Sequence, residues 1–405
     1  MTHHVALAIA LSLKSAIAQA LPRDPAVVQA RAEMSASAAD ARAVAAGGAP
    51  QLFASYSNVP QGGAANTTIA QHLTEIGVNK TFAFPGQLSA QVRAARSTQA
   101  ASVARLARAE REAVTRIVGA YLDASVAEQR AAIADDAVAS AKRLLDAANL
   151  RLRSGAGPKI DVDQAEAAYA SAQAAQADAD GKRDAAYAAL DLAVGIDATA
   201  HPRLDDPDPE EIAVPDDNAA IAAALHARED PRAADDDVLA AAAALRAVQL
   251  SAAPSLDLSA ARQSGVDSGV PISGGTISVS VHVPIDVTGV VRAQVERARA
   301  DYERAVAARE ALRRTVVLDV ESAIAGVRST QLRVNAERRA VDAARSAAAA
   351  ADLGFRHGAT SAVDALIAQS QYVSTRGDLI SAEADAIKAR YALRLAEGVD
   401  VDVTP

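Results

Sequence analysis

The stretch LRLRSGAGPKIDVDQAEAAY, residues 150–169, decides the fold because the chain contains it twice. Its second copy reads LGFRHGATSAVDALIAQSQY, residues 353–372, at a constant offset of 203 residues (358 − 155 and 364 − 161). Each copy follows a long helical run, breaks at a glycine-centred turn and resumes as another helix, which predicts the turn of a helical hairpin. The sequence therefore predicts two helical hairpins in one chain.

The duplication extends well beyond the turns. Leu190 and Gly195 recur as Leu393 and Gly398 at the same offset, and Ala16-Ile17-Ala18 near the start matches Ala220-Ile221-Ala222. A period of about 200 residues is far too long for a solenoid repeat. We infer two copies of a domain-sized unit joined head to tail, which is an internal two-fold repeat.

The repeat sets the predicted division of the chain. In order, the parts are a signal segment at 1–10, a first repeat at 11–204, a Pro/Asp-rich connector at 205–218, a second repeat at 219–400 and a tail at 401–405. Each repeat holds a helix, a strand pair and a long helical hairpin: strands 51–59 and 78–84 with hairpin 87–195, then strands 255–261 and 275–283 with hairpin 287–397. Polar, glycine-containing loops are expected inside the strand pairs at 61–74 and 262–275, and 219–250 is expected to be helical.

The start of the chain leaves two alternatives open. Val5–Leu13 has the apolar character of a signal-peptide core, but no Lys or Arg precedes it. Residues 1–10 are therefore either a truncated signal segment of an exported protein or part of an ordinary first helix.

Composition favours long packed helices over compact globules. Aromatic residues make up 3% of the chain, with no Trp and four Phe, so few large side chains are available to fill a thick core. The net charge is −9 and basic residues alternate with acidic ones, which argues against nucleic-acid binding. Zero cysteines exclude disulfides, thiolate metal sites and a cysteine nucleophile. Neither a catalytic constellation nor a spaced set of metal ligands is visible, so we expect no enzyme activity, no cofactor and no metal.

The strands indicate how the chain could meet a membrane. No apolar run reaches the roughly 18 residues that a membrane-spanning helix needs, so any crossing must use strands. Four strands cannot close a membrane barrel, because bacterial barrels need at least about eight and an open edge leaves amides unsatisfied in lipid. Three copies of the chain would supply twelve strands, which is an even number that closes.

These features together resemble the TolC-type outer membrane factor family, also called outer membrane efflux proteins. The residues that carry the resemblance are Leu150, Arg151, Arg153, Ser154, Gly155, Ala156 and Asp161, their counterparts around Gly358 and Asp364, and the strand exits Phe84-Pro85-Gly86-Gln87 and Pro284-Ile285-Asp286. The resemblance covers nearly the whole chain.

The resemblance implies a mainly α-helical protomer with four strands that join a trimeric twelve-stranded membrane β-barrel, and a long antiparallel coiled-coil tunnel in the periplasm. It implies a passive exit duct in the outer membrane, within a tripartite efflux or type I secretion system. The implied partners are two further copies of the chain, a periplasmic adaptor (membrane fusion protein), an inner-membrane transporter and outer-membrane lipid. An equatorial belt is implied for Ala219–Leu250 and the chain ends.

The resemblance also assigns roles to residues. The periplasmic entrance and adaptor-docking turns would comprise Arg153, Ser154, Gly155, Asp161, Phe355, Arg356, His357, Gly358 and Asp364. The aromatic residues of the membrane barrel would be Phe53, Tyr56, Phe82 and Phe84. Asp161 and Asp364 have two open interpretations: each caps a helix N-terminus, or the two make the entrance electronegative.

The second turn departs from some relatives. Ile367 occupies a position where they carry another acid, and Phe355 replaces a frequent tyrosine. Arg356 and His357 are then candidates for a substitute polar link. The alternative function from another class is a periplasmic coiled-coil scaffold that forms no channel and whose strands pair in a small soluble sheet.

Overall fold

The computed structural model describes residues 11–62, 68–83, 86–195, 204–205, 215–267, 270–284 and 288–399. Predictions for 1–10, for most of the connector, for Phe84 and for 401–405 lie outside these residues. The chain divides into two compact units. The first unit comprises Met1–Gln29, Ala107–Arg228 and Arg314–Pro405, and the second comprises Ala30–Leu106 and Glu229–Arg313.

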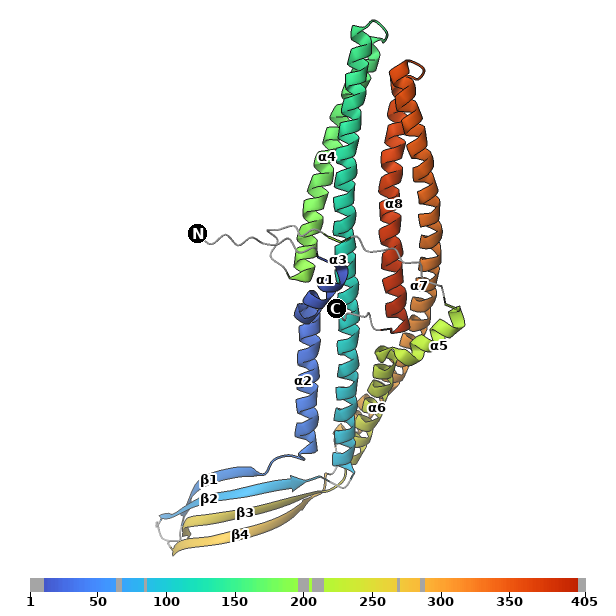
Figure 1. Cartoon of the computed structure of the whole chain (residues 1–405). Helices are drawn as coiled ribbons and strands as arrows, with labels where there is room; N and C mark the ends of the chain where they lie inside the picture. The colour runs from blue at the N-terminus through green and yellow to red at the C-terminus, as the bar shows by residue number, and fades with distance from the viewer. Residues whose placement is uncertain are drawn as a thin grey trace. The chain divides into compact units, whose positions relative to one another are not determined.

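The described elements follow in chain order, as labelled in Figure 1. They are α1 (Leu13–Ala20), η1 (Leu21–Arg23), α2 (Pro25–Ala45), β1 (Gln51–Gly62), β2 (Thr68–Phe82), α3 (Gln87–Arg153), α4 (Lys159–Val194), α5 (Asp217–Ala227), α6 (Glu229–Leu250), β3 (Ser255–Asp267), β4 (Val270–His282), α7 (Val290–His357) and α8 (Ala362–Glu397).

Two helices dominate the chain. α3 has 67 residues and α7 has 68. At about 1.5 Å per residue each is roughly 100 Å long. Neither contains proline, so no backbone amide is missing inside them. In the first unit α3 pairs with α4, and α7 pairs with α8, as two antiparallel hairpins (Figure 1).

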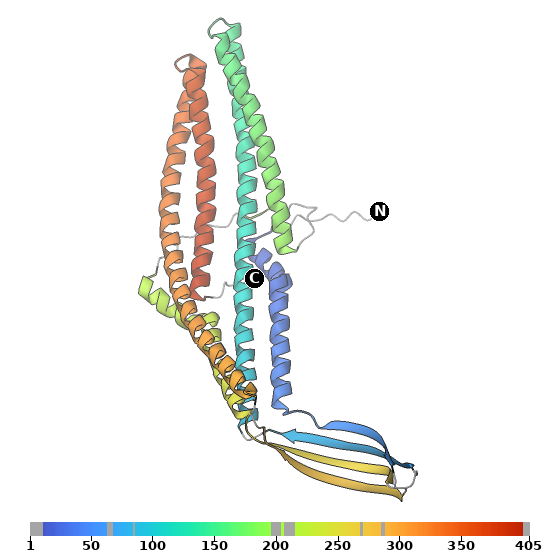
Figure 2. The ribbon, with the colours of Figure 1, turned by 180° about the vertical axis from the view of Figure 1, so that it is seen from behind.

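The four strands form one antiparallel sheet in the order β1-β2-β3-β4 (Figure 2). The strands are longer than the sequence predicted. β1 and β2 pair from Gln51 with Asn79 up to Gly62 with Thr68, and β3 and β4 pair from Ser255 with His282 up to Asp267 with Val270. The loops expected at 61–74 and 262–275 are therefore mostly strand. The alternation is lost there because the face that is apolar elsewhere carries the polar residues Thr74, Ser264 and Ser273 at that end of the sheet.

The helix expected at 219–250 is also two helices, α5 and α6. Arg228 between them has an extended backbone, with φ −65° and ψ 140°. Pro231 lacks the amide that would continue α5, and it is tolerated in the first turn of α6, where no amide is needed.

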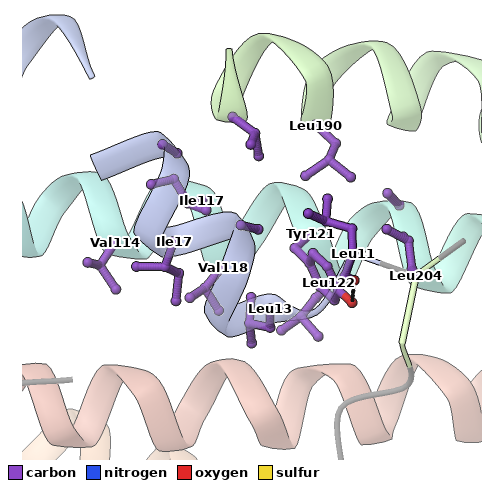
Figure 3. Packing of buried hydrophobic residues seen from close by; sticks show 14 of the residues in the cluster. Leu11, Leu13, Ile17, Val114, Ile117, Val118, Tyr121, Leu122, Leu190 and Leu204 are labelled. Carbon is purple, nitrogen blue, oxygen red and sulfur yellow. Dashed lines mark hydrogen bonds between the residues drawn. The ribbon is translucent and has the colours of Figure 1, made fainter. Parts of the chain in front are cut away.

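The main core of the first unit lies where α1 packs on the middle of α3 (Figure 3). Ile17 and Leu122 are 1% exposed there. The Tyr121 hydroxyl lies 2.7 Å from the Leu11 carbonyl oxygen and 2.8 Å from that of Asp205. This side chain joins two segments that are far apart in sequence, and those segments also meet at a bridge between Leu11 and Leu204. Leu11 and Leu13 belong to the apolar segment Val5–Leu13 that resembles a signal-peptide core. Both are buried in this core of the first unit.

An ion pair joins Asp24, at the start of α2, to Arg116 on α3. The Arg116 Nη2 is 2.7 Å from Asp24 Oδ2, and Oδ1 accepts from the amides of Ala26 and Val27. Burial acts to raise the pKa of Asp24, but the Arg116 hydrogen bond, the two amides and the Arg116 charge together hold it below its usual value.

The corresponding pair in the second half has its charges reversed. Arg116 matches Asp319 on α7 at the repeat offset (319 − 116 = 203), and Asp319 Oδ2 lies 3.2 Å from Arg228 Nη1. Arg228 Nη1 also donates to the Ala396 carbonyl oxygen at 3.4 Å, at the end of α8. The acid is thus on the long helix in one half and on the connecting segment in the other.

Replacing Tyr121 with Phe should lower the free energy of unfolding by about 1–3 kcal/mol, because it leaves two carbonyl oxygens without this donor. Thermal or denaturant unfolding in detergent measures the change. Tyr302→Phe on α7 is the matched control and should change stability by less than about 0.5 kcal/mol. Equal effects of the two substitutions would contradict the role of Tyr121.

Candidate functional site

The first hairpin turn, Ser154–Pro158, closes α3 with a Schellman motif. The Gly155 amide donates to the Leu152 carbonyl at 3.0 Å and the Ala156 amide donates to the Arg151 carbonyl at 2.8 Å. Gly155 has φ +73°, a left-handed conformation that glycine adopts without a steric penalty.

The second hairpin turn, Gly358–Ser361, repeats this geometry at the end of α7. The Gly358 amide donates to the Phe355 carbonyl at 3.1 Å, and the Ala359 amide donates to the Gly354 carbonyl at 2.8 Å. Gly358 has φ +79°. The two glycines that the sequence marked therefore have the same structural role.

Neither aspartate is the capping residue of its helix. The N-cap of α4 is Pro158 and that of α8 is Ser361, so Asp161 and Asp364 each occupy the third helical position. Ser361 Oγ accepts from the Asp364 amide at 3.1 Å and donates to Asp364 Oδ2 at 2.7 Å. The capping interpretation is therefore wrong in its literal form. Both carboxylates still lie in the first turn of a helix, where the helix dipole favours negative charge.

Arg151 joins the two hairpin turns, and the sequence analysis did not include it among the site residues. Its Nη1 donates to the Phe355 carbonyl oxygen at 2.9 Å, and its guanidinium lies 4.8 Å from the centre of the Phe355 ring. Its Nη2 donates to the Ala156 carbonyl at 3.3 Å in the first turn. One side chain therefore contacts both turns through charge-assisted hydrogen bonds and a cation–π contact.

Phe355, which the resemblance assigns to the entrance turns, is not exposed. It is fully buried and packs with Leu144 and Ala148 of α3 and with Ala362 and Ala365 of α8. An aromatic ring fits here because small alanines on the neighbouring helices leave room for it. Phenylalanine, which has no hydroxyl, therefore suits the apolar surroundings of this position.

The remaining residues assigned to the turns are exposed: Arg153, Ser154 and Gly155 at the first, and Arg356, His357 and Gly358 at the second. Arg356 Nη2 forms an ion pair with Asp352 of its own helix at 2.6 Å. Of these arginines, Arg151 therefore links the two turns, whereas Arg356 pairs along α7.

In each turn two positions contact one another, and the two turns place glycine at different members of this pair. A Cβ atom on Gly354 would lie 2.0 Å from Thr360 Oγ1, and a Cβ on Gly157 would lie 3.0 Å from the Arg151 Cβ. Arg151 corresponds to Gly354 and Gly157 to Thr360, so in each turn one of the two contacting positions is glycine. This arrangement frees position 151 to carry the arginine that reaches Phe355.

The sheet in the second unit has an apolar face and a polar face, because side chains alternate along each strand. The apolar face is formed by Leu52, Tyr56, Ile76, Val78, Phe82, Leu256, Leu258, Ile277, Val279 and Val281, all exposed to solvent in the protomer. This face carries two cations, one toward each end of the strands. Lys80 has its Nζ 5.4 Å from the Phe82 ring centre, and Arg262 lies opposite Ile76.

The polar face carries the other side chains. At the end of the sheet where the strands connect to the helices, the polar side chains of this face are Gln51, Ser55, Glu75, Asn79, Thr81, Asp257, Ser259, Ser278, Ser280 and His282. Phe53 also belongs to this face, where its ring lies over Gly77: a Cβ there would be 2.8 Å from Phe53 Cε1. Phe53 is therefore not part of the apolar surface with Tyr56 and Phe82, and Phe84 lies outside the described residues.

Within the described part of the chain, no cluster of three or more His, Cys, Asp or Glu side chains could hold a metal ion. No helix there combines the length and the apolar character required to span a membrane.

Comparison with known proteins assigns the family. The model of the outer membrane efflux protein family matches residues 16–196 and again 220–399. The chain belongs to the outer membrane efflux protein family. This membership confirms the resemblance inferred from the duplicated turns and places the protein among outer-membrane channels with a periplasmic tunnel. It also favours a channel over the scaffold alternative.

Individual relatives of this efflux family protein are distant. Nodulation protein T of Rhizobium leguminosarum bv. viciae is 27% identical over 95% of this chain and 81% of its own length. Among solved structures, the outer membrane protein VceC of Vibrio cholerae has a TM-score of 0.82 at 22% identity, covering 96% of this chain and 97% of VceC. The open state of the MtrE channel of Neisseria gonorrhoeae has a TM-score of 0.80 at 21% identity, covering 97% and 91%. These structural similarities establish the fold, a mainly helical protomer with a four-stranded antiparallel sheet.

Replacing Arg151 with Gln should separate the two hairpin turns, because it removes the cation–π contact and a charge-assisted hydrogen bond worth about 1–3 kcal/mol. The chain has no cysteine, so spin labels on cysteines introduced at Leu150 and Leu353, both exposed, report the distance between turns by electron paramagnetic resonance. We expect a longer or broader distance distribution. Arg153→Gln, an exposed arginine of the same turn, should leave it unchanged, and no difference between the two variants would contradict the link.

Gly354→Ala should destabilise the second hairpin by about 1–3 kcal/mol, because the new methyl group meets Thr360. Adding Thr360→Gly should recover most of the loss, which a double-mutant cycle of unfolding free energies measures. Gly377→Ala on α8 is the control: nothing lies within 4 Å of its Cβ, so it should be neutral or stabilising. Independent, additive effects at 354 and 360 would refute the contact.

Proposed function

We propose that three copies of this chain assemble in the outer membrane into a channel-tunnel that serves as the passive exit duct of a tripartite efflux or type I secretion system. Family membership supports the channel class. The observation that carries the assembly is the apolar face of the sheet, which the protomer leaves exposed.

The dimensions of that face support contact with lipid. From Phe82 to Thr74, the partner of Tyr56, β2 runs eight residues (82 − 74), or about 27 Å at roughly 3.4 Å per residue. Membrane barrels carry an apolar band about 25 Å tall with aromatic residues at both edges. Phe82 and Tyr56 lie at the two ends of this band. Lys80 and Arg262, one row inside each end, can extend their charged groups toward the membrane surfaces.

The strand count supports a trimer. In the described sheet β1 and β4 are the edges, and each pairs on one side. A sheet edge in lipid leaves amides without partners, so the edges must pair with other strands. Four strands from each of three copies give twelve, and β1 of one copy would pair with β4 of the next. The polar face would then line the pore.

The helical hairpins would continue the pore as a tunnel in the periplasm, with the two turns at its entrance. Asp161 and Asp364 would give that entrance negative charge. The exposed residues Arg153, Ser154, Arg356 and His357 are those we assign to contact with a periplasmic adaptor, which would connect the tunnel to an inner-membrane transporter. Because conduction through such a duct needs no catalytic group, we assign none.

The test uses a matched pair of substitutions on β4. Ile277→Arg places a charge on the apolar face, where it should cost about 2–4 kcal/mol in lipid and reduce the yield of membrane-inserted trimer. Ser278→Arg places the same charge on the polar face and should leave insertion of the trimer intact. Ile277 is 79% exposed in the protomer, so a soluble scaffold would tolerate both changes equally. That equality, or a monomer released from membranes by salt, would refute the channel.

A further inference from the structure

An ionisable pair lies on the polar face where the strands join the helices. His282 Nδ1 of β4 is 2.6 Å from Asp257 Oδ2 of β3. Thr81 of β2 donates its hydroxyl to the other carboxylate oxygen, Oδ1. Three adjacent strands therefore hold one carboxylate in a fixed position next to one imidazole.

The surroundings of this pair are polar but uncharged. The facing residues on the same and the adjacent rows are Asn79 on β2, Ser255 and Ser259 on β3, and Ser278 and Ser280 on β4. The nearest other charged residue of the described polar face, Glu75, is six residues from Thr81 along β2, or about 20 Å. Lys80 is on the opposite face. Of the chain that follows β4, Asp286 lies outside the described residues.

The chemistry of the pair makes its charge depend on pH. Both Asp257 oxygens accept hydrogen bonds, which favours the ionised carboxylate. Imidazole is the side chain that changes charge between about pH 5 and 8. With a neutral imidazole the pair carries one negative charge. When the second ring nitrogen, Nε2, takes up a proton, the pair becomes neutral overall.

The first half of the chain has no such pair. At the offset that relates Leu52 to Leu256 (204 residues), Asp257 corresponds to Phe53, which lies on the polar face over Gly77. A trimer would therefore contain three pairs, one from each second half.

We propose that the Asp257–His282 pair contributes to the charge selectivity of the channel and makes this selectivity depend on pH. This inference rests on the proposed trimeric channel. When the imidazoles are neutral, three negative charges on the pore wall raise the local cation concentration. Acid removes this net charge and lowers the preference for cations.

Planar-bilayer recordings test the proposal. Reversal potentials in a KCl gradient give the K⁺/Cl⁻ permeability ratio at pH 8 and pH 5.5. The mean salt should be near 0.1 M or below, because the Debye length is then about 10 Å or more. The wild-type ratio should fall on acidification. In His282→Gln the fall should shrink to less than half of the wild-type change, and in Asp257→Asn the ratio at pH 8 should be lower than in the wild type.

His72→Gln is the matched control. His72 faces the apolar side of the sheet, on β2, so its removal should leave the full pH response. A pore whose pH response survives His282→Gln and whose pH 8 ratio survives Asp257→Asn overturns this inference and leaves the channel in place. Failure to observe any pore overturns both. The His282 side chain is 68% exposed, so the Gln variant should fold normally.

Discussion

The apolar face of the four-stranded sheet is left uncovered in the protomer, and burying apolar surface is worth roughly 25 cal/mol for each Å². Monomeric proteins in water rarely expose a contiguous patch of this kind. The sheet also ends in two edges whose backbone groups face outward on one side. These two facts together make the protomer incomplete. The need to cover one surface and pair two edges explains why a chain with few large aromatic residues is built around strands of twelve to fifteen residues.

The sequence predicted the helical part well because its signals are local. α3 begins at Gln87, the predicted start of the first hairpin, and ends at Arg153, just before the predicted glycine-centred turn, since no proline interrupts it and a glycine in the left-handed region ends it. The strands were predicted too short. At Thr74, Ser264 and Ser273, at the end of the apolar band, the face that is apolar elsewhere carries polar residues, so the alternation that marks a strand disappears.

The candidate site was predicted only in part for a related reason. Gly155 and Gly358 could be found because a Schellman turn is defined by its own neighbours along the chain. The contact of Arg151 with Phe355 joins residues 204 positions apart, and no local pattern encodes such a contact. One signal was present: position 151 is arginine where its repeat counterpart, Gly354, has no side chain. Differences between the two copies mark where the halves have separate roles.

The reversed ion pairs provide a second difference of this kind. Asp24 meets Arg116 in one half, whereas Arg228 meets Asp319 in the other. If the connecting segment of one half docked on the long helix of the other, acid would face acid and base would face base. In a chain made of two similar copies, this reversal disfavours exchange of the connecting segments between the two halves. Because the charges are reversed at both members of the pair, each connecting segment is favoured to dock on the long helix of its own half during folding.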